Sequence, residues 1–247
     1  MRRNGVWFSD SGEGVPLLVL HPGGTDSRSM GALCAELADY RILLIDRPGH
    51  GRSADVDGPW SFERMADVVA EVLDDLDIER VHVLGWSDGA IVGLHLALQR
   101  PDLVSTLVFG GGVFHHEGWH DGVLSDDPPP AFMAESYAEV SPDGAAHWAD
   151  VVAKSVELHR AHPSLTANDL RQVRLPVLVI VGDDDEVRFD HVVGMYEALP
   201  DAELAVIPRS THGLIVEKPD VVALFVRDLH RGDRSDGVAP RRRVMRA

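Results

Sequence analysis

Short apolar runs alternate with longer amphipathic segments along most of the chain. Apolar runs bounded by turn residues predict buried strands, and apolar residues spaced three to four positions apart predict helices. Strands are expected at 6–9, 17–21, 42–46, 81–85, 103–110, 177–182 and 203–207. Helices are expected at 29–38, 62–76, 89–99, 188–199 and 219–230. The alternation predicts an α/β fold, with a mostly parallel central sheet and helices on both faces.

The stretch 111–173 breaks this rhythm, because it has helical patterns near 132–139 and 145–160 and no strand pattern. A connection of this length is too long for a simple loop. We interpret it as a small helical cap, inserted into a core made of residues 1–110 and 174–230. From Arg231 the pattern is lost and the chain becomes basic, which predicts a disordered basic tail over 231–247.

Composition narrows the class of protein. The chain has 247 residues, of which 45% are hydrophobic and 26% charged, as in soluble globular proteins. No apolar run reaches membrane-spanning length and no signal core follows the N-terminus, so we expect a cytoplasmic protein without membrane contact. The net charge of -17 argues against nucleic-acid binding, because phosphates would be repelled. We expect a monomer or homodimer, and the single cysteine excludes an intrachain disulfide.

The segment Gly85-Trp86-Ser87-Asp88-Gly89 lies between an expected strand and an expected helix. Gly-x-Ser-x-Gly in that context is the pattern of a nucleophile elbow. The turn holds the serine in a strained backbone conformation, so that its hydroxyl projects from the sheet edge. The two glycines leave room where the strand and the helix nearly touch.

A serine hydroxyl is a weak nucleophile at neutral pH and needs a base, which a third group orients. In this kind of fold the chain order is Ser, then Asp or Glu, then His. His212 is the candidate base, in a loop after the last expected strand. The candidate acid is one of three adjacent carboxylates, Asp183, Asp184 and Asp185, which follow the strand that ends at Gly182.

Five segments together resemble the capped α/β-hydrolases and span about residues 15–229. They are His21-Pro22-Gly23-Gly24, Asp46 to Ser53, the elbow around Ser87, Gly182-x-x-Asp185, and His212-Gly213. In that family the acid stands three residues after the glycine that ends its strand, which implies Asp185. The resemblance implies a serine hydrolase, esterase-like, that needs no cofactor or metal. Its substrate would be a small ester, thioester, lactone or amide, cleaved through an acyl-enzyme on Ser87.

The resemblance also implies an oxyanion hole made by the backbone N–H groups of Gly23 and Asp88. The chain departs from the family at Pro22, where the family usually has glycine. Proline has no N–H and cannot donate. Gly24 is the alternative donor.

The residue after the nucleophile bears on the substrate. The Gly-Trp-Ser-Asp-Gly elbow resembles that of the valacyclovir hydrolase (biphenyl hydrolase-like) family, which cleaves α-amino acid esters and holds the substrate ammonium with the matching aspartate. The resemblance implies that Asp88 binds substrate. Alternatively, Asp88 only begins a helix, where an acidic side chain suits the helix dipole.

An apolar substrate pocket has three aromatic candidates: Trp86, Phe114 and Trp148.

The histidines of the cap segment could also suggest a metal site. His115, His116 and His120 with Glu117 match no standard zinc spacing, so no metal site is expected.

The second function hypothesis is a protein of this fold that does not hydrolyse: a cyclase, a lyase or a ligand-binding receptor. A complete set of serine, acid and histidine favours hydrolysis, because binding alone requires none of the three.

Overall fold

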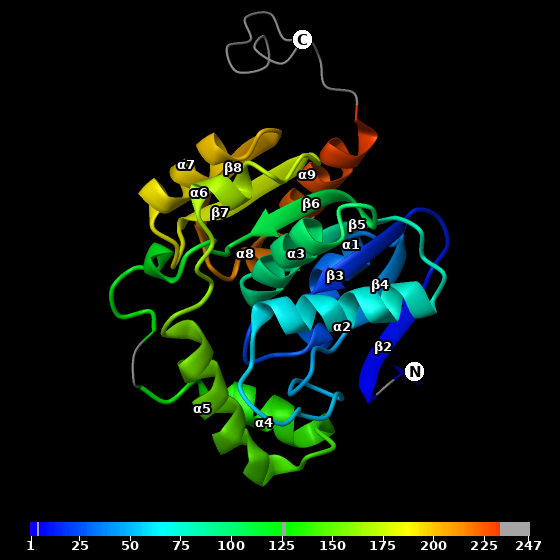
Figure 1. The fold of residues 1–247 in the computed structure, drawn as a ribbon, viewed down its shortest axis with the longest axis vertical. Helices are drawn as coiled ribbons and strands as arrows, with labels where there is room; N and C mark the ends of the chain where they lie inside the picture. Colours follow the sequence, from blue (N-terminus) through cyan, green and yellow to red (C-terminus); the bar gives the residue numbers. More distant parts are fainter. Residues whose placement is uncertain (4, 125–126, 233–247) are drawn as a thin grey trace, which may run out of the picture.

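The apolar runs form a twisted sheet at the centre of the molecule (Figure 1). The structure is a computed structural model that describes residues 1–3, 5–124 and 127–232. Within these residues the strand order is β1-β2-β4-β3-β5-β6-β7-β8. β2 pairs antiparallel with β1 and with β4, whereas β3 to β8 pair in parallel with one another, which confirms the predicted mostly parallel sheet. The strands are β1 Arg2–Arg3, β2 Val6–Ser11, β3 Pro16–Leu20, β4 Arg41–Ile45, β5 Val81–Trp86, β6 Val104–Gly110, β7 Val177–Asp184 and β8 Ala202–Thr211.

Two hydrophobic clusters cover the two faces of the sheet, as β3 illustrates. Leu18 and Leu20 belong to the cluster that includes α2, α3 and α7, whereas Leu17 and Val19 belong to the cluster with α1, α8 and α9. Successive strand residues point to opposite faces, so a continuous apolar run fits a sheet buried on both sides. The helices are α1 Gly31–Glu36, α2 Phe62–Asp75, α3 Asp88–Gln99, α7 Phe189–Ala198, α8 Leu214–Glu217 and α9 Pro219–Arg231.

Two helices between β6 and β7 stand apart from the sheet (Figure 1). They are α4 Ala131–Val140 and α5 Trp148–His159, and we call them the cap helices. A short 3₁₀ turn, Ala145–His147, precedes α5, so the single helix expected at 145–160 is divided. The last part of the expected insertion returns to the core, where α6 (Ala167–Leu170) packs against α7. In the part of the chain that the structure describes, no helix is long and apolar enough to cross a membrane.

Several elements differ in extent from the sequence prediction. The helix expected at 29–38 is only Gly31–Glu36, because a 3₁₀ turn capped by the Asp26 side chain precedes it. β8 runs four residues beyond the predicted end at 207, and its Ser210 N–H donates to the Asp183 carboxylate beside the end of β7. α9 continues to Arg231, so the tail predicted over 231–247 starts too early; residues 233–247 lie outside the described residues.

We expect Gly89→Ala to destabilise the fold by about 1–3 kcal/mol or more, because overpacking forces a well-packed interior to shift. A Cβ on Gly89 would overlap the Leu20 carbonyl and come 2.7 Å from the His21 oxygen. Gly194→Ala in α7 is the control, since nothing lies within 4 Å of its added Cβ. There the greater helix propensity of alanine should stabilise by up to about 1 kcal/mol. Urea unfolding measures both; equal midpoints for the two variants would contradict the predicted close approach.

Candidate active site

Ser87 sits at the sharp turn between β5 and α3. Its backbone has φ 54° and ψ -122°, a conformation that non-glycine residues rarely adopt and that the surrounding structure must enforce. The Ser87 N–H donates to the Gly110 carbonyl at 2.8 Å, which fixes the turn to the end of β6. A Cβ on Gly85 would overlap the Gly89 backbone, so both glycines of the sequence pattern are needed for the close approach. The geometry is that of a nucleophile elbow.

His212 and Asp185 meet beyond the ends of β7 and β8. The His212 Nδ1 donates to Asp185 Oδ1 at 2.8 Å. The Asp185 carboxylate, 2% exposed, also accepts from the Gly182 N–H at 3.1 Å, which holds it in place. Of the three adjacent carboxylates, Asp185 is thus the one that pairs with His212, whereas Asp183 accepts from the Ser210 backbone.

The imidazole of His212 lies at the same sheet edge as Ser87. The Trp86 Nε1 donates to the His212 carbonyl at 2.9 Å, and a Cβ on Gly111 would come 3.1 Å from the imidazole Cε1. Trp86 precedes Ser87 directly, and Gly111 follows the strand that pairs with β5. These contacts seat the imidazole against the carboxyl ends of β5 and β6, where the elbow begins.

The surroundings of His212 favour its protonated form. Burial acts to lower the pKa of His212, but the hydrogen bond and charge of Asp185, with the charges of Glu186 and Asp88, outweigh burial and raise it above 6.5. Glu186 Oε2 lies 3.7 Å from Nε2, the nitrogen opposite the one bound to Asp185. Sequence reasoning did not single out Glu186, although its position next to the candidate acid was a usable signal.

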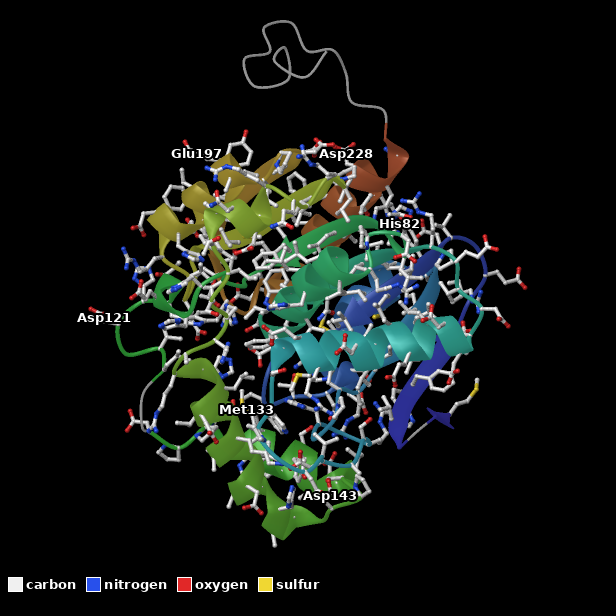
Figure 2. All side chains as sticks on the ribbon, in the orientation of Figure 1. His82, Asp121, Met133, Asp143, Glu197 and Asp228 are labelled. Atoms are coloured by element: carbon white, nitrogen blue, oxygen red, sulfur yellow. The ribbon has the colours of Figure 1, made fainter. Side chains whose placement is uncertain are left out.

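The loop after β3 lies against the elbow. A Cβ on Gly23 would overlap the Asp88 carboxylate, so this glycine touches the residue that follows Ser87. Gly24 has φ +63° and faces the cap: a Cβ there would come 3.0 Å from the Sδ of Met133 on α4, a residue labelled in Figure 2. Gly23 is therefore the loop glycine beside the elbow, and Gly24 is turned towards the cap helices.

A buried arginine holds this loop in place through hydrogen bonds to Pro22 and His21. The Arg47 Nη2 donates to the Pro22 carbonyl at 3.1 Å, and its backbone N–H donates to His21 Nε2. Arg47 is fully buried, and burial lowers its pKa to about 10, although the charges of Asp88 and Asp46 oppose the shift. Arg47, in the Asp46 to Ser53 segment, thus helps to position the loop that carries the oxyanion-hole candidates.

Asp88 has a partner that the sequence did not reveal. Its side chain is 8% exposed and lies 2.8 Å from His159 Nε2, at the end of cap helix α5. Burial acts to raise the pKa of Asp88, but the charge and hydrogen bond of His159 and the charge of Arg47 hold it well below its usual range. A buried carboxylate needs a counter-charge. The need for a counter-charge could have been inferred from the sequence for a buried Asp88. The sequence does not say which cationic side chain of the cap supplies that charge.

The three aromatic pocket candidates have different surroundings. Trp148 lies at the start of α5 and lines a cavity. Phe114 stacks on His191, with ring centroids 4.1 Å apart. Trp86 is 1% exposed within the core, where it supports the backbone of His212. Its placement therefore differs from the expected pocket position, because the strand turns this side chain under the elbow.

The cavity lies between the core loops and the cap helices. It encloses about 200 Å³ of space, part of it open to solvent. None of the triad candidates lines it, but Gly24, the neighbour of Gly23, does. Its walls come from Gly24, Thr25, Asp26, Gly49, His50, Gly51, Ser136, Tyr137 and Trp148.

Comparison with known proteins identifies the family of the chain. The profile of the alpha/beta hydrolase family matches residues 17–223. The chain belongs to the α/β hydrolase family. Its activity class is therefore hydrolysis of the α/β-hydrolase type.

Two relatives of the chain carry names that refer to different substrates. The chain is 27% identical over 241 residues to "Putative carbamate hydrolase RutD" of Azorhizobium caulinodans, covering 87% of this chain and 91% of that protein. It is 30% identical over 244 residues to a 2-hydroxy-6-oxononadienedioate/2-hydroxy-6-oxononatrienedioate hydrolase of Cupriavidus pinatubonensis, covering 84% of each. A solved meta-cleavage product hydrolase of Pseudomonas fluorescens superposes with a TM-score of 0.76 at 19% identity, over 93% of this chain and 95% of that one.

We expect Glu186→Gln to move the acid limb of the pH profile of kcat/KM to lower pH. A general base must be neutral, so activity should rise as pH increases through the raised pKa of His212. Without the Glu186 charge that pKa falls, and the rise begins earlier. Glu197→Gln, on α7 at the outer edge of the molecule (Figure 2), is the matched control and should leave the limb in place. An unmoved limb in Glu186→Gln would contradict the assignment.

Proposed function

We propose that the protein is a serine hydrolase that cleaves a small ester, thioester, lactone or amide through an acyl-enzyme on Ser87. The observation that carries the proposal is the combination of Ser87 at positive φ in the elbow with the 2.8 Å pair of His212 and Asp185 at the same sheet edge. A serine at positive φ is strained and persists only where the surrounding structure holds it, which is typical of functional sites.

The chemistry follows from these positions. Ser87 Oγ attacks the substrate carbonyl while His212 Nε2 accepts its proton, and Asp185 stabilises the imidazolium that results. The N–H groups of Gly23 and Asp88 stabilise the oxyanion, with Gly24 as the alternative donor. His212 then gives the proton to the leaving group. Water attacks the acyl-enzyme with His212 as base, which releases the acid and regenerates Ser87.

The cap contributes to the wall of the cavity beside Gly24, through Ser136, Tyr137 and Trp148. An acyl group bound on this side of the elbow would contact Trp148. A carbamate has a carbonyl group of the same kind, so attack by Ser87 is also compatible with the name of the RutD relatives.

The surroundings of Asp88 bear on whether the site accepts a charged or a neutral acyl group. An α-amino acid ester, the substrate implied by the elbow, would place an ammonium beside this carboxylate. In the structure His159 already occupies one carboxylate oxygen at 2.8 Å, so an ammonium would have to displace it. We therefore propose a neutral acyl group as the preferred form of the substrate.

We expect Ser87→Ala and His212→Ala each to lower kcat for short-chain esters by roughly 10⁴–10⁶-fold, because the triad acts as a unit. Asp185→Asn should cost roughly 10⁴-fold, since it leaves the imidazole in the wrong tautomer. Asp183→Asn is the matched control and should keep most activity. Initial rates on phenyl esters from acetate to hexanoate measure all four variants. A folded Ser87→Ala protein with full activity would refute the acyl-enzyme.

A further inference from the structure

His159 carries hydrogen-bond acceptors at both of its ring nitrogens. Nε2 lies 2.8 Å from Asp88 Oδ1, and Nδ1 lies 2.8 Å from the Ser155 carbonyl oxygen. The Ser155 hydroxyl is more distant, at 3.4 Å, so the carbonyl sets the role of Nδ1. A carbonyl oxygen only accepts, and an ionised carboxylate only accepts. Both ring nitrogens must then donate, which makes His159 an imidazolium.

The neighbours of the pair support this charge state. The His159 side chain is 11% exposed and packs edge-on against Phe62, with ring centroids 5.8 Å apart. The other titratable groups close enough to interact with the pair are Arg47, His50 and His212. Burial acts to lower the pKa of His159, but the charge and hydrogen bond of Asp88 outweigh burial and the opposing Arg47 charge and raise it. The Arg47 charge also favours the ionised form of Asp88, whereas His50, whose pKa burial lowers to about 4, is neutral at pH 6.5.

Both oxygens of the Asp88 carboxylate are covered. Oδ1 faces His159, and Oδ2 lies against Gly23, where even a Cβ would overlap it. The position next to the nucleophile that a substrate cation would take is thus filled by a cation of the cap itself. Displacing His159 would leave an imidazolium beside the Phe62 ring without its counter-charge, and would break the contact between α5 and the elbow.

We propose that His159 is a specificity-determining residue, whose imidazolium neutralises Asp88 and so excludes substrates with an ammonium group next to the scissile carbonyl. This inference rests on the proposed hydrolase function and narrows its substrate class to acyl groups that are uncharged at that carbon. It also assigns a chemical role to the end of cap helix α5.

The test compares two esters of nearly the same shape, benzyl isobutyrate and benzyl alaninate, at pH 6.5. They differ in one group, a methyl in the first and an ammonium in the second. We expect the wild-type protein to favour the isobutyrate at least 10-fold in kcat/KM. His159→Ala frees the Asp88 carboxylate, so this preference should fall at least 10-fold. Adding Asp88→Asn to His159→Ala should cancel the gain on the alaninate.

A control variant distinguishes loss of the charge beside Asp88 from a general loosening of the cap. His147 Nε2 donates to Asp55 Oδ2 at 2.9 Å and joins the cap to the core at another place. His147→Ala loosens the cap without changing the charge at Asp88, so the preference should stay as in the wild type. Equal shifts in His147→Ala and His159→Ala would overturn the proposal, as would a wild-type preference for the alaninate.

A second readout does not depend on turnover. Alaninamide and isobutyramide are titrated against each protein while the imidazole signals are followed by ¹⁵N NMR. In the wild-type protein we expect both ring nitrogens of His159 to be protonated at pH 6.5 and alaninamide not to bind more tightly than isobutyramide. In His159→Ala alaninamide should bind more tightly. A neutral His159 would overturn the proposal. Loss of all ester cleavage with these NMR results intact would refute the hydrolase function alone.

Discussion

The positive φ of Ser87 is the constraint on which the site depends. It exists because β5 and α3 meet the end of β3 at backbone contact distance, a packing that only Gly85 and Gly89 allow. Because the serine is held there by the core, its hydroxyl position does not depend on the cap. Asp185 and His212 then need only the two neighbouring strand ends, β7 and β8, to reach the same edge.

The cap is joined to the core by buried apolar residues, such as Tyr137, Val151 and Leu158, and by charged side chains. Arg28 pairs with Glu139 on α4 at 2.7 Å, and Asp55 accepts from Lys154 on α5 at 2.6 Å. Exposed pairs of the first kind contribute at most about 1 kcal/mol. The Asp88–His159 pair is the most buried of the three and stands next to the nucleophile. Opening the cap therefore separates a buried pair of charges, which links access to the site with the charge beside Ser87.

The sheet and the elbow were predictable because their signals are local. The apolar run at 17–20 requires burial on both faces, and the Gly-x-Ser-x-Gly spacing requires a tight turn. Among the three adjacent carboxylates the residues alone left the choice open, and only the family resemblance implied Asp185, which pairs with His212. The pair of Asp88 and His159 was not predictable, because 71 positions separate the two residues and the helical pattern does not say which face of α5 meets the elbow. The burial of Trp86 in the core has a similar origin, because residue type does not reveal which way a strand turns its side chain.

The central claim is that Ser87 is an activated nucleophile. Intact-mass measurement after treatment with a fluorophosphonate tests it most directly, because the reagent reacts with activated serines whatever the natural substrate. The account predicts a single adduct on the wild-type protein that is absent from Ser87→Ala and strongly slowed in His212→Ala. No adduct on a folded wild-type sample, or an adduct that persists in Ser87→Ala, would contradict the account.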